Sequence, residues 1–222
     1  MNQRWLALPL IAVALACSPP ASDSAPAAPL PKPTRDLAEP TAPGQTRTAV
    51  LAGGCFWCIE AVFEPLNGVR QVVSGYAGGT AAEAHYQIVS AGNTQHAESV
   101  QITYDPTKIS YGTLLRVFFS LHHPTQRDGQ GPDHGHQYRS AIFYANDRQK
   151  DVAEAYIHQL DQAKIFPAPI VTSLERLDKF YPAEDYHQDF VANHPDHPYV
   201  RAWALPKLAK LRELYPELLQ TK

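Results

Sequence analysis

The chain has 222 residues, of which 44% are hydrophobic and 18% are charged, and its formal net charge is −3. This length suits one domain of ordinary size, and the composition supplies enough apolar surface for a core. The charge balance argues against nucleic-acid binding and against a polybasic membrane-binding stretch. Three cysteines are too few for a disulfide scaffold, so we expect a globular domain held by its core.

The N-terminus has the pattern of an export signal. Residues 5–16 form an apolar run after Arg4 that is shorter than the roughly 20 residues a membrane-spanning helix needs, which predicts a signal peptide over residues 1–16. A small-x-small cleavage site is followed at once by Cys17, an arrangement that resembles a bacterial lipoprotein lipobox, although Ala14 stands where Leu is usual. We expect a lipoprotein tethered through Cys17 in the periplasm of the bacterial cell envelope. Ordinary secretion and a cytoplasmic protein with a chance apolar start are the alternatives.

Residues 17–45 have the composition of a linker. Between residues 18 and 43 there are eight prolines, six alanines and three serines, and apolar residues show no periodicity. Such a segment buries too little surface to offset the entropy of ordering it. We therefore expect a flexible tether over residues 17–45 that lies outside the fold.

Strands and helices alternate in the rest of the chain. Apolar runs and period-two patterns predict strands over residues 48–52, 69–76, 97–104, 140–144 and 170–174. Apolar residues at helical spacing predict helices over residues 56–66, 110–121, 147–164, 182–190 and 206–219. This order is typical of a single α/β domain, a two-layer sandwich with a mixed sheet and a ferredoxin-like core. We place the catalytic domain at residues 46–205, with a C-terminal helix over residues 206–222.

Two cysteines lie at the start of the first predicted helix. Cys55 follows Gly53-Gly54 in the first turn, and Cys58 comes three residues later on the same helical face. The amide groups and dipole at a helix N-terminus stabilise an anion, so we expect a lowered pKa for the Cys55 thiol. A pair with this spacing is typical of a redox-active dithiol. The alternative, half of a zinc site, needs two further ligands.

Glu98 lies on the apolar face of its predicted strand. The alternation from residue 97 to residue 104 places it beside Val100, Ile102 and Tyr104. A carboxyl group in apolar surroundings has a raised pKa and can hold a proton near neutral pH. Glu98 is therefore a candidate acid. The alternative is a carboxylate at a strand end that reaches solvent.

The glycine-punctuated loop over residues 122–139 carries several histidines. Asp133, His134 and His136, with His122 and His123 upstream, suggest a metal loop, but their spacing matches no standard ligand pattern. The alternative is a structured polar loop whose donors line a pocket.

Several motifs together resemble the peptide methionine sulfoxide reductases of type A. The resemblance covers about residues 48–195, and its motifs are Gly54-Cys55-Phe56-Trp57-Cys58, Val73-Ser74-Gly75-Tyr76-Ala77-Gly78-Gly79, Tyr86, His96-Ala97-Glu98, Gly131-Pro132-Asp133, Gln137-Tyr138-Arg139-Ser140 and the stretch from Phe180 to Gln188.

The resemblance implies a role for each of these site residues. Cys55 would attack the sulfoxide sulfur of free or protein-bound methionine-S-sulfoxide, and Phe56 and Trp57 would form the pocket for the S-methyl group. Glu98 would protonate the sulfoxide oxygen, and the side chains around it would be Tyr86, Asp133 and Tyr138. A second thiol normally resolves the sulfenic acid left on Cys55. The family needs no metal and no bound organic cofactor, and a thioredoxin-type donor reduces the disulfide.

This chain departs from the family pattern in its cysteines. Cys58 stands where many members have Gly, and no cysteine follows it, so Cys58 is the expected resolving thiol. His123 and Gln95 also replace usual residues, at positions outside the matched site. We expect a monomer without nucleic-acid partners. The competing hypotheses are a thioredoxin-like thiol–disulfide oxidoreductase that uses Cys55 and Cys58, and a periplasmic metal-binding protein.

Overall fold

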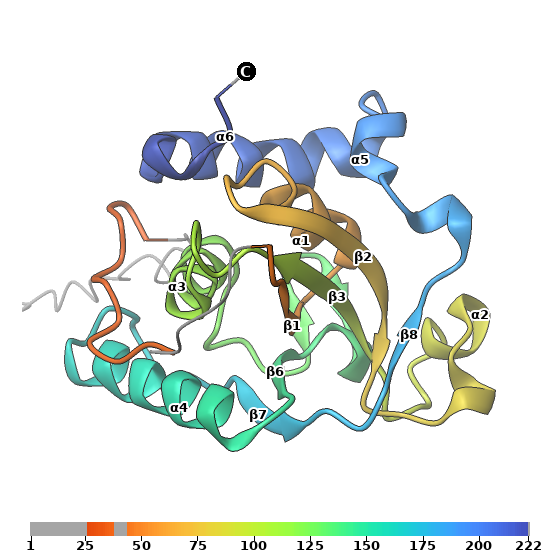
Figure 1. Ribbon diagram of the computed structural model, residues 1–222. Helices are drawn as coiled ribbons and strands as arrows, with labels where there is room; N and C mark the ends of the chain where they lie inside the picture. Colours follow the sequence, from red (N-terminus) through yellow and green to blue (C-terminus); the bar gives the residue numbers. More distant parts are fainter. Residues whose placement is uncertain (1–25, 38–43, 222) are drawn as a thin grey trace, which may run out of the picture.

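Six strands form one strongly curled, mixed sheet at the centre of the molecule (Figure 1). The computed structural model describes residues 26–37 and 44–221. The sheet order is β7-β6-β1-β3-β2-β8, and only the β6–β7 pair is parallel. The strands are β1 (Arg47–Gly53), β2 (Val69–Ala77), β3 (Ala97–Tyr104), β6 (Ser140–Tyr144), β7 (Ser173–Arg176) and β8 (Phe180–Pro182). A separate two-stranded ribbon of β4 (Gly129–Gln130) and β5 (Asp133–His134) lies within the predicted polar loop.

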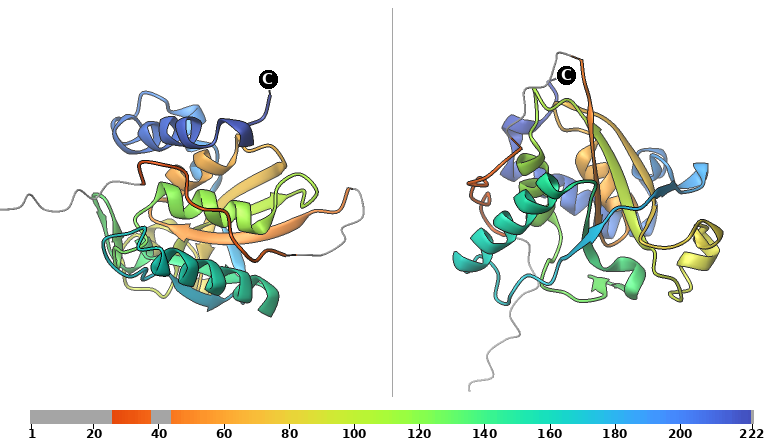
Figure 2. Two further views of the ribbon diagram at one scale, coloured as in Figure 1. Left: turned by 90° about the vertical axis from the view of Figure 1, so that its left-hand side faces the viewer. Right: turned by 60° about the horizontal axis from the view of Figure 1, so that its bottom comes forward.

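The helices pack mainly on one face of this sheet. They are α1 (Phe56–Phe63), α2 (Tyr86–Val89), α3 (Tyr111–Leu121), α4 (Asp147–Gln162), α5 (Phe190–Asn193) and α6 (Leu205–Leu214), the last preceded by a π-helical turn over Val200–Ala204. Helix α3 lies between α4 and α6 (Figures 1 and 2). Buried apolar side chains of α1, α3, α4 and α6 form the main core with the facing side of β1 and β3. A smaller cluster around Val50, Ala97 and Phe143 covers the other side of the sheet. No helix in the described ranges is long and apolar enough to span a bilayer.

Strand β3 confirms the predicted alternation. Its bounds are those predicted, and Val100, Ile102 and Tyr104 are buried on the helix-covered face together with Glu98. Ser110 caps α3 through its hydroxyl, which accepts a hydrogen bond from the Thr113 amide at 3.1 Å. The sequence pattern therefore suffices for the central elements of the fold.

The predicted helix over residues 182–190 is wrong. The segment contains the end of β8, a 3₁₀ turn over Asp185–His187 and the start of α5. Long-range hydrogen bonds to β2 replace the hydrogen bonds of the predicted helix. The Ala183 amide donates to the Ser74 carbonyl, and the Gln188 side chain bonds both the amide and the carbonyl of Ser74. The C-terminal helix also ends earlier than predicted, at Leu214, since Pro216 cannot continue it.

Residues 30–37 are packed against the domain, in contrast to the expected tether over residues 17–45. Leu30 is only 2% exposed; its amide donates to the Tyr215 hydroxyl at 3.0 Å and its carbonyl accepts from Arg116 Nε at 2.6 Å. Further bonds tie the segment to α3 and α4, namely those from Tyr156 to Pro31, from Gln159 to Lys32, from Thr34 to Gln159 and from Gly112 to Asp36. The segment runs along α3 and α4 (Figure 2), and these helices supply partners that its composition does not reveal.

Candidate active site

Cys55 lies at the junction of β1 and α1. Strand β1 ends at Gly53, Gly54 has a φ of +95°, and Cys55 is the N-cap residue of α1, one position before the helical turn in which the sequence placed it. A Cβ on Gly54 would come within 2.6 Å of the Gln130 side chain, so this sharp turn requires glycine. Cys55 is 9% exposed and Cys58, in the first turn of α1, is 1% exposed.

Burial controls the chemistry of the two thiols. The expectation of a lowered pKa for Cys55 is wrong, because burial, the contact with the Cys58 thiol and the nearby Glu98 carboxyl raise it well above its usual value. Cys58 has a lowered pKa, chiefly because the Cys55 thiol hydrogen-bonds to it. The two thiols therefore act on each other, and both are free cysteines. Desolvation outweighs the helix N-terminus at Cys55.

Glu98 lies directly beside the start of α1. Its Oε2 accepts a hydrogen bond from the Phe56 amide at 3.1 Å, and the side chain is 2% exposed. Burial raises its pKa to about 8, and the Asp133 and Cys58 side chains add to the shift. The carboxyl group is therefore protonated over most of the neutral range, as its position on the apolar face predicts.

Three half-buried side chains surround Glu98. Tyr86 begins the short helix α2, Asp133 is in β5, and Tyr138 ends the 3₁₀ turn before β6. The electrostatic influence of Glu98 and Cys55 on both tyrosines, together with burial, raises their pKa values. The structure thus brings together the candidate residues that the sequence placed on separate segments.

Tyr199 is a site residue that sequence reasoning missed. Its hydroxyl donates a hydrogen bond to Asp133 Oδ2 and lies within hydrogen-bonding reach of both thiols. It belongs to the turn before the π-helical segment, more than 140 residues from Cys55 in the chain. No local pattern marks it, because His197-Pro198-Tyr199 has the appearance of an ordinary loop.

An aromatic wall borders the thiols. Phe56 is buried against Tyr76 and His187, with ring centroids 5.9 and 5.0 Å apart. Trp57 is partly exposed, stacks on Phe190 at 3.7 Å and donates from Nε1 to His187 Nδ1 at 3.1 Å. His187 and Phe190 were also missed, because the sequence predicted one helix through them. The hydrogen bond and the stacking fix the indole next to the nucleophile.

The loop histidines do not converge on the thiols as a cluster. His122 hydrogen-bonds the Phe118 carbonyl and the Ser140 hydroxyl in the core, and burial lowers its pKa to about 3. His136 pairs with Asp128 at 3.0 Å. Within residues 26–37 and 44–221, no three acidic, histidine or cysteine side chains gather in a way that could hold a metal ion. Cys17, the candidate lipidation site, lies outside the described residues.

These groups can carry out two-electron chemistry on a sulfur–oxygen bond. Cys55 supplies a nucleophile, the Glu98 carboxyl supplies a proton, and Cys58 is in contact to form a disulfide. The aromatic wall offers an apolar surface for a small alkyl group.

Relatives of this chain share one activity in their descriptions. A family model described as peptide methionine sulfoxide reductase matches residues 47–218. A peptide methionine sulfoxide reductase MsrA 2 from Mesorhizobium japonicum is 55% identical over 185 residues, which is 83% of this chain and 94% of that protein. An MsrA from Thermus thermophilus is 51% identical over 172 residues, 78% of this chain and 97% of its own.

Solved structures of two proteins have folds similar to that of this chain. Mxr1 from Saccharomyces cerevisiae in its reduced form matches with a TM-score of 0.64 and 30% identity, over 72% of this chain and 92% of that one. Methionine sulfoxide reductase A of Corynebacterium diphtheriae matches with a TM-score of 0.59 and 33% identity, over 77% and 85% of the two chains.

Proposed function

The chain belongs to the peptide methionine sulfoxide reductase family and is a type A enzyme of it, and from this premise we propose how its residues divide the reaction. Cys55 is the nucleophile, Glu98 is the acid, and Cys58 is the resolving thiol. The substrate is methionine-S-sulfoxide, free or in a protein. The observation that carries the assignment is the buried contact of Glu98 with the first amide after Cys55, at 3.1 Å.

The reductive step transfers one oxygen atom. The Glu98 carboxyl donates a hydrogen bond and then a proton to the sulfoxide oxygen, which makes the sulfur electrophilic, and the Cys55 sulfur attacks it. The sulfur–sulfur bond formed by this attack and the sulfur–oxygen bond of the substrate then break as the hydroxyl moves to the Cys55 sulfur, so methionine leaves and Cys55 becomes a sulfenic acid. Methionine sulfoxide gains two electrons and the cysteine loses two, so the step needs no further reactant.

Because the pKa of Cys55 is raised, Glu98 also has a role in the ionisation of the Cys55 thiol. A thiol attacks poorly, and burial holds Cys55 as a thiol until substrate enters. Where Glu98 is already a carboxylic acid, loss of the Cys55 proton creates the reactive combination of thiolate and carboxylic acid; where Glu98 is ionised, transfer of that proton to its carboxylate creates the same combination. The hydroxyl of Tyr199, which donates to Asp133 in the structure, would turn from Asp133 to donate to the thiolate.

Cys58 completes the cycle. Its thiol attacks the sulfenic sulfur of Cys55, a disulfide forms, and water leaves. Cβ atoms three residues apart on a helix are about 5–6 Å apart, whereas a disulfide needs about 3.5–4.5 Å, so the first turn of α1 adjusts locally. A thioredoxin-type donor then reduces the disulfide.

Phe56 and Trp57 form the pocket for the S-methyl group. Their rings are held in place by Tyr76, His187 and Phe190, so the apolar surface is ordered before substrate binds. The polar side of the pocket consists of Tyr86, Asp133 and Tyr138, around the sulfoxide oxygen. One apolar and one polar side would orient a chiral sulfoxide.

An assay with separate epimers tests this proposal. The purified protein is incubated with dithiothreitol and either the S or the R epimer of N-acetylmethionine sulfoxide, and remaining substrate is measured by chromatography. We expect loss of the S epimer only. Loss of neither epimer, combined with reduction of insulin disulfides, would instead support the thioredoxin-like oxidoreductase.

We also infer the finer architecture and the location of the protein. Strands β6-β1-β3-β2 with α1 and α3 have the order of a two-layer, ferredoxin-like core. The apolar leader and Cys17 support export as a monomeric lipoprotein in the periplasm. In cells, Cys17→Ser should move the protein from the membrane fraction to the soluble one, with the catalytic rate unchanged. Wild type that is wholly soluble and cleaved after Ala16 would instead indicate simple secretion.

A further inference from the structure

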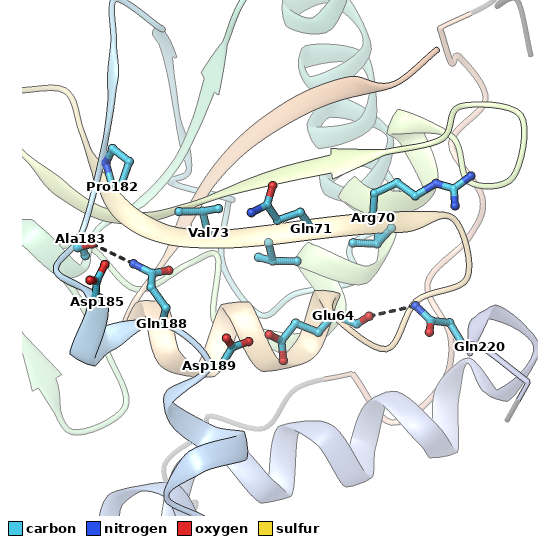
Figure 3. Close-up of a pocket in the computed structure, with 12 residues that line it drawn as sticks. Glu64, Arg70, Gln71, Val73, Pro182, Ala183, Asp185, Gln188, Asp189 and Gln220 are labelled. Atoms are coloured by element: carbon cyan, nitrogen blue, oxygen red, sulfur yellow. Dashed lines mark hydrogen bonds between the residues drawn. The ribbon is translucent and has the colours of Figure 1, made fainter. Parts of the chain in front are cut away.

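A groove runs along the outer edge of β2, beside the end of α1 (Figure 3). Its volume is about 450 Å³, and its walls come from β2, from residues 182–189 and from Gln220 near the C-terminus. We propose that this groove, the β2-edge groove, binds an extended segment of an oxidised protein substrate that carries a lysine or arginine. The inference rests on the proposed function and extends it to the substrate beyond the sulfoxide.

The edge of β2 offers backbone groups to an incoming strand. Strand β8 pairs only with Gly75–Ala77, and Ser74 turns both its amide and its carbonyl to the same side, where Gln188 and Ala183 bond them at 2.9–3.0 Å. Alternate residues of a strand direct their polar groups to the same edge, so Val72 directs its amide and carbonyl into the groove. Within the described residues no strand or loop pairs with Val72 on this side. An unpaired edge of this kind is a template for an added strand.

The lining of the groove holds more carboxyl groups than basic groups. The carboxyl groups of Glu64 and Asp189 point toward each other across it, and Asp185 lies at one end (Figure 3). Arg70 is the one basic residue of the lining, and its guanidinium bonds Asp105 at 2.8 Å. Burial and the neighbouring carboxyls raise the pKa of Glu64 to about 8.

A fully buried carboxyl group stands behind this pair. Glu60, one turn before Glu64 in α1, is 1% exposed, and neither of its oxygens has a hydrogen bond of good geometry among the described residues. Burial raises the pKa of Glu60 to about 7, the charge of Asp189 adds to the shift, and the Asp189 backbone and Ser74 offset part of it. A ligand that brings a positive charge would therefore stabilise Glu60, Glu64 and Asp189 together.

The geometry favours a basic side chain over a metal ion. The described carboxyls do not converge as metal ligands. A lysine or arginine on an extended chain can lay its stem along the groove and place its donors between Glu64 and Asp189, and charge-assisted bonds of this kind are stronger than neutral ones. The unpaired backbone edge of β2 and the carboxyl pair thus favour the same ligand, an extended peptide with a basic side chain.

The groove and the active site share one wall. Within residues 184–189, Glu184 bonds the Tyr76 hydroxyl and the Tyr86 amide, His187 bonds Trp57, and the next two residues line the groove. Val72 is four residues from Tyr76, about 13 Å along the strand. A protein segment with its sulfoxide at Cys55 can therefore reach the groove with a residue about four to eight positions away, whereas free methionine sulfoxide cannot.

Peptide kinetics test the proposal. Peptides carry one methionine sulfoxide and one lysine or arginine, placed at successive positions on either side, and each has a twin with glutamine at that position. With dithiothreitol as reductant we expect kcat/KM of the full chain to be about tenfold higher for the best-placed basic peptide than for its twin, through KM. Backbone N-methylation of the segment away from the sulfoxide should abolish the gain, because it removes the donors that pair with the edge.

Variants locate the effect. Glu64→Gln combined with Asp189→Asn should bring the ratio between basic and neutral peptide close to one, and asparagine tolerates the left-handed φ of +53° at residue 189. Glu154→Gln, an exposed carboxylate on α4, is the matched control and should keep the full ratio. A wild type without preference at any position, or a double variant that keeps it, would overturn the proposal.

A binding measurement separates this proposal from the proposed function. Fluorescence anisotropy of the same labelled peptides, with methionine in place of the sulfoxide, on Cys55→Ser protein does not depend on catalysis. Tighter binding of the basic peptide, lost in the double variant, supports the groove even if no sulfoxide is reduced. Equal affinity for both twins refutes the groove even if the sulfoxide is reduced normally.

Discussion

Replacement of Glu98 by glutamine removes the transferable proton of this side chain and keeps its shape. The amide can still accept the hydrogen bond from the Phe56 amide, which is 3.1 Å from Oε2, and can still donate one to the sulfoxide oxygen. It cannot release a proton in the transition state. General acid catalysis contributes about 10²–10⁴-fold, so the reductive step should slow by a factor in that range. The fold should persist, because the change removes a buried ionisable group whose charged form is unfavourable.

The rate of the reductive step should also depend on pH in a different way in Glu98→Gln. The pKa of Glu98 is about 8 and that of Cys55 is raised well above its usual value, so thiol and carboxylic acid dominate below about pH 8, and thiol and carboxylate dominate above it. The reactive pair, thiolate and carboxylic acid, holds one proton fewer than the first state and the same number as the second. Its population rises about tenfold per pH unit up to about pH 8 and is level above that, until the thiol itself ionises. Glu98→Gln should lose this break and continue to rise toward the pKa of the thiol.

Single-turnover kinetics measure both effects. Protein in excess is mixed with methionine-S-sulfoxide without reductant between pH 6 and pH 9.5, quenched, and the methionine formed is quantified; Glu154→Gln is the control. A glutamine variant within about twofold of wild type at every pH would remove Glu98 from the role of acid. A common pH profile for the two proteins would refute the exchange of a proton between Cys55 and Glu98.

Three other substitutions, and the dependence of stability on pH, have expected outcomes that can be measured. Cys58→Ser should convert about one equivalent of substrate at a near-normal rate. Recycling by thioredoxin should then fail, while dithiothreitol should restore part of the turnover. Full thioredoxin-dependent turnover would mean that the donor attacks the sulfenic acid directly. Tyr199→Phe removes the hydrogen bond to Asp133 and the hydroxyl that lowers the pKa of Cys55, so the single-turnover rate should fall about tenfold, and a rate within twofold would contradict this. Leu30→Ala should lower the free energy of unfolding by about 2 kcal/mol in urea titrations, near the low end for a buried leucine because the segment can detach; an unchanged midpoint would show that its docking adds no stability. The folded chain binds more protons than the unfolded chain between about pH 4.5 and pH 8, because the pKa values of Glu60, Glu64 and Glu98 are raised, so thermal stability should fall as pH rises through this window and fall less in Glu98→Gln.

Much of the site could be predicted from local pattern. The alternation of β3 places Glu98 among apolar side chains without knowledge of any other segment, and its raised pKa follows from that. Gly53-Gly54 before an apolar helical run likewise places Cys55 at a helix start. Both inferences hold because each depends on neighbours within a few residues.

Contacts between distant segments could not be predicted. The pKa of Cys55 is raised because packing buries it, and helix position alone suggests the opposite. Residues 182–190 have helical spacing, but the Gln188 side chain binds Ser74 across more than 100 residues of sequence and imposes another path. Tyr199 reaches the thiols only because the turn before α6 folds over α1.

The docking of residues 30–37 sets the distance at which a lipid on Cys17 would hold the enzyme. A chain extends at most about 3.3–3.6 Å per residue, so the thirteen residues from Cys17 to Leu30 reach no further than about 45 Å, whereas a chain free as far as residue 45 would reach about 100 Å. If lipidated at Cys17, the enzyme would meet damaged proteins only in a layer next to the membrane, with the flank formed by α3 and α4 nearest to its anchor. Lengthening the stretch between Cys17 and Leu30 would deepen that layer and leave the chemistry of Cys55 as it is.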